Sequence, residues 1–381
     1  MIKPISKGLY KFYGALKPLI FKLKADDAHA GMISLGQMVQ KIPGAMPLIS
    51  KSLAFSDPIL KTDICGLKFS NPLGLTAGID KDGKIIRMVR AIGFGLEEVG
   101  SVTLKPYGGN PAPMYTRLVK TKSILVNAGL KSDGAKKVIA RLHNLKNKDL
   151  ENFVLNVSVA KTNNAKNCSD ERAIEDYCAS LKLWEESGRA DMYTINISCP
   201  NTFGGEPFTT PEKLEKLLKE IAKLNIKKPI SVKMPIDKDW PEFRELLLVA
   251  KKYQIKVITI GNLFKNRDKI KLKDEIDLKN LPGNFSGEPC WSSSNHLLEK
   301  SYQEFKKDFK FIGVGGVFDA EDAYTKITLG ASLVEIGTGV IFQGPAMVGR
   351  LNMQLAEILK KNGFKSVSEA VGSANTKAKP K

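Results

Sequence analysis

The stretch Asp191-Met-Tyr-Thr-Ile-Asn-Ile-Ser-Cys-Pro-Asn-Thr202 joins a short apolar run to a loop that carries a thiol between two carboxamides. We interpret the apolar part as a β-strand and the part after it as an active-site loop that Pro200 stiffens. A cysteine thiol has an ordinary pKa of about 8.5, so a modest local field makes Cys199 a usable base at neutral pH. Asn196 and Asn201 each offer donors and an acceptor for a planar substrate held beside that base. A buried cysteine in an ordinary loop is the alternative, and the choice depends on the rest of the chain.

Seven further apolar runs share this pattern, because each is followed by a stretch with helical spacing. The expected strands cover residues 73–77, 96–101, 153–157, 192–197, 230–233, 256–260, 311–314 and 333–336. The expected helices cover residues 84–92, 135–145, 171–186, 211–224, 241–253, 293–307, 320–328 and 346–361. A long irregular excursion follows the second strand, and an insertion follows the sixth. Eight strand-then-helix units in about 290 residues predict an α/β fold, the (β/α)8 or TIM barrel. An open, doubly wound sheet is the competing architecture, but it seldom contains eight parallel strands with such regular crossovers.

Polar residues stand where the strands end, which is the face at which barrels of this class carry catalytic groups. They are Lys81, Ser101, Asn156, Asn196 with Cys199, Lys233 and Asn262, one set for each of the first six strands. Any one of them is more often structural than functional, but six in register favour a functional site. The last two strands end in Gly313-Val-Gly-Gly316 and Gly337-Thr-Gly339, and glycine loops in these positions are typical of a phosphate site.

Composition limits the compartment and the partners. The chain has 381 residues, 43% of them hydrophobic, which suffices for one large barrel. A formal charge of +19 admits nucleic acid, a phospholipid surface or small anions as partners, with a generally lysine-rich composition as the alternative explanation. Five cysteines without C-x-x-C spacing indicate reduced thiols in a cytosolic setting. Together with only three histidines, they argue against a metal site.

The first 24 residues alternate apolar or aromatic side chains with lysines, and no small-residue cleavage site follows. We interpret them as a basic segment that lies on a membrane surface, with a helix docked on its own domain as the alternative. A further helix is expected from Ala25 to Val39, before Gly44 and Pro47 interrupt the pattern. No apolar run is long enough for a spanning helix. We therefore expect a helical extension at 1–52, the barrel at 53–365 and a disordered basic tail at 366–381.

The chemistry of these residues is consistent with flavin mononucleotide (FMN). Its phosphate would lie in the glycine loops, and Lys233 would stabilise negative charge that builds on the ring as it accepts a hydride. Cys199 would remove a proton from the carbon next to the one that gives up the hydride, which leaves a carbon–carbon double bond.

Five segments together resemble the dihydroorotate dehydrogenase family over nearly the whole chain. They are Asn71-Pro-Leu-Gly-Leu-Thr-Ala-Gly-Ile-Asp-Lys81, Glu98-Val-Gly-Ser-Val-Thr103, Asn196-Ile-Ser-Cys-Pro-Asn-Thr202, Ile312-Gly-Val-Gly-Gly316 and Gly330-Ala-Ser-Leu-Val334. The resemblance implies oxidation of (S)-dihydroorotate to orotate in pyrimidine synthesis, with FMN as cofactor and Cys199 at the position of the base. It implies flavin contacts from Ala77, Gly78, Lys81, Ser101, Asn156, Asn196, Lys233, Gly261, Ser286, Gly287, Gly315, Gly316, Gly337 and Thr338. It implies substrate contacts from Lys81, Asn127, Gly129, Leu130, Asn196, Asn201, Asn262 and Leu263.

The helical extension is similar to that of the membrane-associated, quinone-reducing branch of the family. This implies a peripheral protein on the cytoplasmic side of the membrane that passes electrons to a quinone, with His29 and Arg117 at the quinone site. Cysteine as the base instead resembles the soluble branches, which reduce fumarate or NAD and would make the protein cytoplasmic. Gly337 also replaces a tyrosine often found beside the quinone, so all three electron acceptors stay open.

Two further departures concern the substrate loops. Val126 stands where the family usually has an asparagine, and an asparagine follows at Asn127, so either the loop shifts by one residue or a substrate hydrogen bond is lost. Gly261-Asn-Leu263 stands where Thr-Asn-Thr is common.

Two rival functions are consistent with parts of the chain. A tRNA dihydrouridine synthase is also a flavin barrel with an Asn-x-x-Cys-Pro loop, and a charge of +19 would suit RNA. Because no RNA-binding domain follows the barrel, we do not expect a nucleic-acid partner. A barrel that serves as a membrane-surface scaffold without turnover is the second rival, and the combination of Lys81, Lys233 and Cys199 argues against it.

Overall fold

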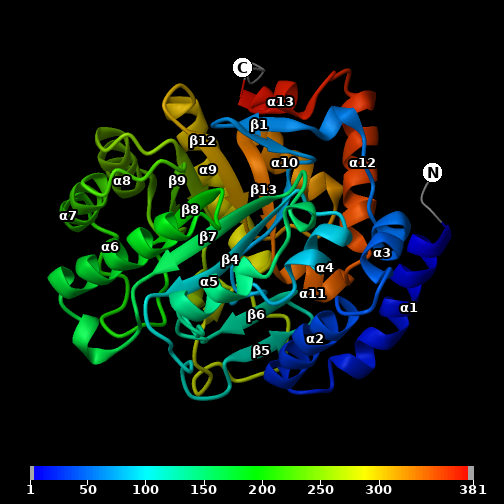
Figure 1. Ribbon diagram of the computed structural model, residues 1–381, viewed down its shortest axis with the longest axis horizontal. Helices are drawn as coiled ribbons and strands as arrows, with labels where there is room; N and C mark the ends of the chain where they lie inside the picture. Colours follow the sequence, from blue (N-terminus) through cyan, green and yellow to red (C-terminus); the bar gives the residue numbers. More distant parts are fainter. Residues whose placement is uncertain (1–3, 376–381) are drawn as a thin grey trace.

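A computed structural model describes residues 4–375, and the chain folds into a closed barrel of eight parallel strands surrounded by helices (Figure 1). The strands are β3 (Leu73–Leu75), β4 (Leu96–Thr103), β7 (Val154–Ala160), β8 (Met192–Asn196), β9 (Ile230–Met234), β10 (Val257–Ile260), β12 (Lys310–Val314) and β13 (Ala331–Ile336). They follow the order β10, β12, β13, β3, β4, β7, β8, β9, and β9 pairs with β10 to close the barrel. The predicted (β/α)8 barrel is confirmed, and the alternative of an open, doubly wound sheet is excluded.

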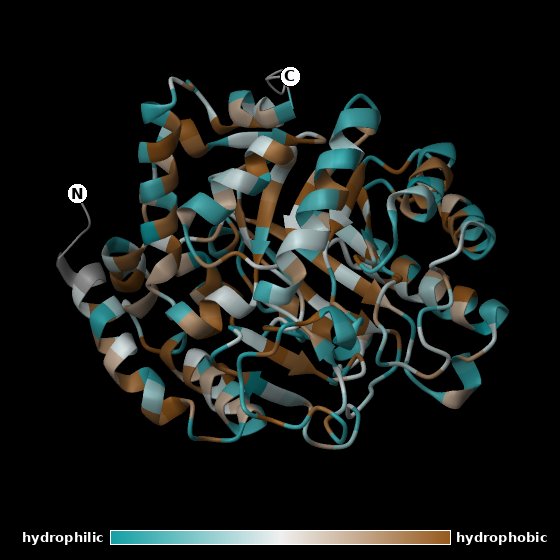
Figure 2. Cartoon of the chain, turned by 180° about the vertical axis from the view of Figure 1, so that it is seen from behind, coloured by the Kyte–Doolittle hydropathy of each residue, from teal (hydrophilic) through white to brown (hydrophobic). Residues whose placement is uncertain are grey.

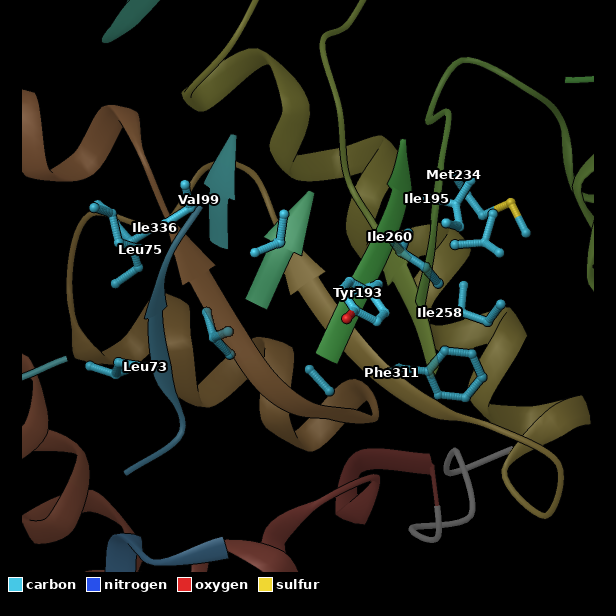
Figure 3. Packing of buried hydrophobic residues seen from close by; sticks show 14 of the residues in the cluster. Leu73, Leu75, Val99, Tyr193, Ile195, Met234, Ile258, Ile260, Phe311 and Ile336 are labelled. Atoms are coloured by element: carbon cyan, nitrogen blue, oxygen red, sulfur yellow. The ribbon is translucent and has the colours of Figure 1, made fainter. Parts of the chain in front are cut away.

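Three of the helices around the barrel, α6, α8 and α10, begin at a capping side chain. Ser169 precedes α6 and Asp239 precedes α8, and each side chain accepts a hydrogen bond from the backbone N–H three residues further on. The helices that follow the strands are α4 (Ile86–Ala91), α5 (Ala135–His143), α6 (Asp170–Ser187), α7 (Pro211–Ala222), α8 (Trp240–Lys252), α9 (Trp291–Phe305), α10 (Ala320–Leu329), α11 (Thr338–Gln343) and α12 (Met347–Lys361). Their apolar faces and the strands share one buried cluster, part of which is shown in Figure 3.

The amino-terminal end of the barrel is closed by a β-hairpin, β1 (Thr62–Ile64) and β2 (Leu67–Phe69). Ile64 and Phe69 of the hairpin are buried against apolar strand residues: Leu96, Val154, Met192, Val257, Ile312 and Leu333. Apolar side chains therefore fill this end of the barrel, and its polar side chains gather at the other end.

A small antiparallel sheet lies in the two segments that interrupt the strand–helix alternation. β5 (Tyr115–Leu118) and β6 (Ser123–Val126) follow β4, and β11 (Asn284–Phe285) follows β10 and pairs with β6. The expectation that the excursion after the second strand is irregular is wrong for these residues. Its third strand comes from more than 150 residues away, and a local pattern in the sequence cannot show such a pairing.

Helices precede the barrel, as expected, and there are three within the described residues: α1 (Pro4–Ile20), α2 (Ala25–Val39) and α3 (Ala45–Leu53), the last of which was not predicted. Pro47 does not interrupt the last of them, because it lies in the first turn, where the backbone N–H groups have no partner within the helix. Two tyrosine hydroxyls fasten α1 to the segment around α11. Tyr10 donates to Oε1 of Gln343 at 2.6 Å and Tyr13 to the backbone oxygen of Ile341 at 2.5 Å. Residues 1–3 of the basic segment lie outside the described residues.

The extension carries most of the exposed apolar surface. Of the twelve exposed large hydrophobic residues in the described chain, nine belong to it: Leu9, Phe12, Leu19, Leu23, Met32, Leu35, Met38, Ile42 and Leu48. Figure 2 shows hydrophobic and hydrophilic segments alternating along these helices at the amino-terminal side of the molecule. Within residues 4–375, no helix has both the length and the apolar character that crossing a membrane requires.

The carboxyl-terminal segment differs from expectation. Residues 366–375, expected to belong to a disordered tail, form α13 (Val367–Ala370) and a short 3-10 turn (Ser373–Asn375). Val367 and Ala370 are buried, because α13 packs beside α10. The remaining residues of the expected tail, 376–381, lie outside the described part of the chain.

Candidate active site

One cavity of about 710 Å³ extends from the mouth of the barrel to the apolar inner faces of α1, α2 and α3. This volume is within the usual range for small-molecule and cofactor sites, about 300–1,000 Å³. All the predicted site residues border it except Asn127 and Asn156. Residues from the ends of five of the first six barrel strands, the two glycine loops and the helical extension therefore meet around one space.

A network of short polar side chains lies at the ends of β4 and β8. Nδ2 of Asn196 donates to Oγ of Ser101 at 2.7 Å, and Nδ2 of Asn262 donates to Oγ of Ser198 at 2.6 Å. Ser198 in turn donates to the backbone oxygen of Lys233 at 2.9 Å. Each of these side chains is thus held in a single orientation at the cavity wall. Asn156 is buried in the barrel instead of lining the cavity, because its Nδ2 donates to Oγ1 of Thr194 at 2.8 Å.

A buried ion pair lies in the wall of the cavity. Nζ of Lys233 is 2.7 Å from Oε2 of Glu98, and the two side chains are 6% and 0% exposed. Lys233 also donates to Oγ1 of Thr76 at 3.1 Å, and the backbone N–H of Ala77 donates to Glu98 at 3.0 Å. Burial alone would raise the pKa of Glu98, but the Lys233 ammonium outweighs burial and holds the pKa below its ordinary value. The pair therefore presents a cation beside the cavity with its counterion behind it.

Cys199 borders the cavity, and its thiol differs from the expectation of an easily ionised base. Burial raises its pKa to about 11, and the nearby Glu206 carboxyl also raises it. The ammonium groups of Lys161 and Lys233 act in the opposite direction but do not outweigh burial. With no ligand bound, the thiol is protonated at neutral pH, and its conjugate base is strong once formed.

The loop after Cys199 is held by asparagine side chains. Nδ2 of Asn201 donates to the backbone oxygen of Val126 at 2.7 Å, and its Oδ1 accepts from Asn284 at 2.9 Å. Asn110 donates to Oδ1 of Asn127 at 3.1 Å and to the backbone oxygen of Asn201 at 3.0 Å. Val126 borders the cavity and Asn127 does not. The side chain of Asn127 supports the loop instead, through its hydrogen bond with Asn110.

Lys81, Tyr115 and His29 form the passage between the barrel mouth and the helical extension. The Lys81 ammonium contacts the Tyr115 hydroxyl, and the rings of Tyr115 and His29 lie 5.5 Å apart. Burial, together with the neighbouring Lys131, lowers the pKa of Lys81 to about 8. Asp26 at the start of α2 accepts hydrogen bonds from the backbone N–H groups of Met114, at 3.2 Å, and Tyr115, at 3.4 Å. This carboxylate therefore ties the extension to β5.

Both residues expected at a quinone site border the cavity and also have structural partners. Nε2 of His29 donates a hydrogen bond to the backbone oxygen of Ile79 at 2.8 Å. Arg117 donates to the backbone oxygens of Phe21 at 3.2 Å and Leu23 at 2.7 Å, which holds the turn between α1 and α2.

The glycine loops are shaped for close approach to the backbone. Gly315 and Gly316 have φ angles of +101° and +76°, where a side chain is strained. A Cβ atom on either residue would lie 2.8 Å from the Cβ of Cys290 or Trp291, respectively. The hydroxyls of Ser286 and Thr338, which border the same cavity, are 2.8 Å apart. These groups offer backbone N–H and hydroxyl donors of the kind that bind a phosphate.

Sequence reasoning missed three residues of this site, namely Glu98, Glu335 and Tyr115. Glu98 lies within a quoted motif but received no role, and Glu335 lies in the apolar run of β13. A carboxylate in an otherwise apolar buried strand was the available signal for both, because such a group needs a partner. Tyr115 gave no signal, since its contacts depend on the unpredicted β5.

Residues 59–359 match a family model described as dihydroorotate dehydrogenase. A relative from Nostoc punctiforme, named dihydroorotate dehydrogenase (quinone), is 34% identical over 374 residues, which cover 96% of this chain and 98% of that protein. A relative of the same name from Trichodesmium erythraeum is 34% identical over 379 residues, with coverage of 96% and 99%. Among solved structures, DHODH from Eimeria tenella in complex with ferulenol superposes with a TM-score of 0.83 at 26% identity, covering 94% of this chain and 99% of that chain.

Proposed function

Because this chain belongs to the dihydroorotate dehydrogenase family of oxidoreductases, we propose that it oxidises (S)-dihydroorotate to orotate in pyrimidine synthesis, with FMN as cofactor and a membrane quinone as the final electron acceptor. The observation that carries the proposal is the single cavity that brings Lys81, Lys233 and Cys199 together with the glycine loops. The tRNA synthase and the inactive scaffold are not supported by the family match.

The residues around the cavity fit FMN. Gly315, Gly316, Ser286 and Thr338 supply a phosphate cradle, and the two glycines have no room for a side chain because a Cβ atom would collide with Cys290 or Trp291. The buried cation of Lys233 suits the electron-rich edge of a flavin ring, and Ser101 and Asn196 add neutral hydrogen-bonding groups. When bound, the flavin supplies the hydride acceptor. The protein's own part is to bind the ring, to hold the substrate against it and to exclude water.

Cys199 is the residue that we assign to the proton. Dihydroorotate loses a hydride from one ring carbon and a proton from its neighbour, and the thiolate of Cys199 takes up that proton. Asn196 and Asn262 border the same space and are held by Ser101 and Ser198, so they are oriented to hold the flat substrate ring. Lys81 offers an ammonium group for the substrate carboxylate.

The helical extension supports a quinone as the acceptor. The cavity continues from the barrel mouth between α1, α2 and α3, and four of the nine exposed hydrophobic residues of the extension, Leu9, Phe12, Met32 and Leu35, border it. The other five form exposed apolar surface on the extension. We propose that this face lies on a membrane, peripherally and on the cytoplasmic side, so that a lipid-dissolved quinone enters between the helices past Arg117 and His29. Cys199 and Gly337 are the residues that favour the alternative acceptors, fumarate or NAD.

An anaerobic spectroscopic assay tests the proposal. The purified chain should show flavin absorption that dihydroorotate bleaches, and a ubiquinone or menaquinone analogue should restore it faster than fumarate or NAD. Flavin that dihydroorotate does not bleach would refute the substrate. Restoration only by fumarate or NAD would refute the acceptor and leave the first half of the reaction intact.

A further inference from the structure

The cavity wall contains a buried carboxyl group, that of Glu335, to which the proposed chemistry gives no role. Glu335 on β13 borders the cavity and is 0% exposed, yet neither of its carboxyl oxygens has a hydrogen-bond donor among the described residues. Oε1 of the neighbouring Glu98 also lacks a donor. Buried acceptors without donors are unfavourable, so the pair of carboxyl groups needs an explanation.

The surroundings of Glu335 contain one cation for two carboxyl groups. Glu98 faces it from β4 and Lys233 from β9, and these are the charged groups that act on it. Its partners in the sheet, Gly74 of β3 and Val314 of β12, do not titrate. If both carboxyl groups were ionised, the cluster would carry a net charge of −1 on side chains that are buried.

We propose that Glu335 keeps a proton at neutral pH, donates it in a hydrogen bond to Glu98, and thereby holds the net charge of the Glu98–Lys233–Glu335 cluster at zero beside the cofactor. One proton between the two side chains gives Oε1 of Glu98 its missing donor and removes the uncompensated charge. Burial, followed by the Glu98 carboxylate, raises the pKa of Glu335 well above its ordinary value, in agreement with this arrangement.

The proton has a consequence for the proposed function, on which this part of the inference rests. A flavin gains negative charge when it accepts a hydride, and a cluster with a net charge of −1 would oppose that gain. With Glu335 neutral, the Lys233 cation is balanced by Glu98 alone. Glu335 is therefore a residue that tunes the reduction potential of the cofactor and does not itself take part in bond making.

The chain offers a matched control for a test. Glu97 is the neighbour of Glu98 on β4, is also 0% exposed, and has two carboxyl oxygens without donors. Burial, together with Asp80, raises the pKa of Glu97 well above its ordinary value, but Glu97 does not border the cavity. Glu97→Gln therefore removes a buried protonated carboxyl group away from the cofactor.

The experiment compares the native protein, Glu335→Gln and Glu97→Gln. In infrared spectra of the flavin-free protein, each variant should lose one carbonyl band of a protonated carboxyl group. In the flavin-loaded protein, the spectral difference between the oxidised and reduced states should contain a carboxyl band that disappears in Glu335→Gln only. The midpoint potential of Glu335→Gln should equal that of the native protein at pH 7, and the native value should fall below it at alkaline pH, where Glu335 ionises.

Two results would overturn the inference. One is a midpoint potential of Glu335→Gln above the native value already at pH 7, which would show that Glu335 is ionised there. The other is a flavin-free spectrum in which Glu335→Gln loses no protonated carboxyl band. Failure of dihydroorotate to reduce the flavin would refute the proposed function instead, because neither measurement on Glu335 uses that substrate.

Discussion

The pH dependence of flavin reduction follows from two shifted pKa values. As the proposed base, Cys199 must be a thiolate to take up the substrate proton, and burial raises its pKa to about 11. As the proposed partner of the substrate carboxylate, Lys81 must be protonated, and burial lowers its pKa to about 8. At pH 7 about one thiol in 10⁴ is ionised, while most Lys81 is still charged.

The product of these two fractions gives the profile. Between pH 6 and pH 8 the second-order rate constant for reduction by dihydroorotate should rise about tenfold per pH unit, because the thiolate fraction rises and Lys81 keeps its proton. Between about pH 8 and pH 11 the rate constant should stay level, because loss of the Lys81 proton offsets the gain in thiolate. The first bend near pH 8 thus belongs to Lys81, although Cys199 produces the rise.

Anaerobic stopped-flow absorbance at low substrate concentration measures this second-order rate constant directly. The pH dependence of that constant reports ionisations of the free enzyme and the free substrate. Cys199→Ala should bind flavin and substrate but reduce the flavin at least about 10²-fold more slowly, and its profile should lose the rise below pH 8. A native profile that is flat from pH 6 to pH 8, or an unchanged rate in Cys199→Ala, would refute the assignment of the base.

Three further predictions concern stability and the electron acceptor. Lys233→Met should destabilise the flavin-free protein by about 3–5 kcal/mol in chemical unfolding, because it leaves the Glu98 charge buried without a partner. The loss should shrink in acid, where Glu98 is protonated, and in the double variant with Glu98→Gln; equal losses would contradict a charge effect. Asp26→Ala should weaken the docking of α2 by about 1–3 kcal/mol and slow reoxidation by a quinone analogue more than it slows flavin reduction. Asp27→Ala, in the same turn but exposed, is its control, and equal effects of the two changes would refute the role of the tether. Deletion of residues 1–24 should leave reduction by dihydroorotate intact and impair reoxidation by quinone; undiminished reoxidation would show that α1 does not form the entrance.

The barrel could be predicted from the sequence because its signals are local. An apolar run such as Ile230–Met234, followed by an amphipathic helix such as α8, shows its period within a short window. The complete sheet of β5, β6 and β11 could not be predicted in this way, because β11 joins the β5–β6 hairpin from more than 150 residues away. Pro47 was misread because its effect depends on its place in the helix rather than on its presence.

In the candidate site, too, the features with a local sequence signal could be predicted, and those that depend on distant residues could not. Strand ends and glycine loops placed most of the predicted residues around the cavity, because the carboxyl ends of parallel strands must meet. The ordinary pKa of a thiol did not indicate the raised pKa of Cys199, since that shift comes from burial by residues remote in sequence. Asn127 and Asn156 have side chains of the expected chemistry that point to partners within the protein. The path of the backbone decides whether such a side chain points into the cavity or toward a partner within the protein.

Strand β5 contacts both the part of the cavity at the barrel mouth and the part between the helices of the extension. Its Tyr115 side chain contacts Lys81 on the side of the barrel mouth, and its backbone and Arg117 hold α2 and the turn before it. A molecule that settles among the helices and moves this strand must therefore alter the affinity for dihydroorotate. Thermodynamic reciprocity requires dihydroorotate to alter the affinity for that molecule by the same factor. Inhibitors that bind among the helices of the extension are thus expected to show mixed inhibition against dihydroorotate, although the two do not compete for the same atoms.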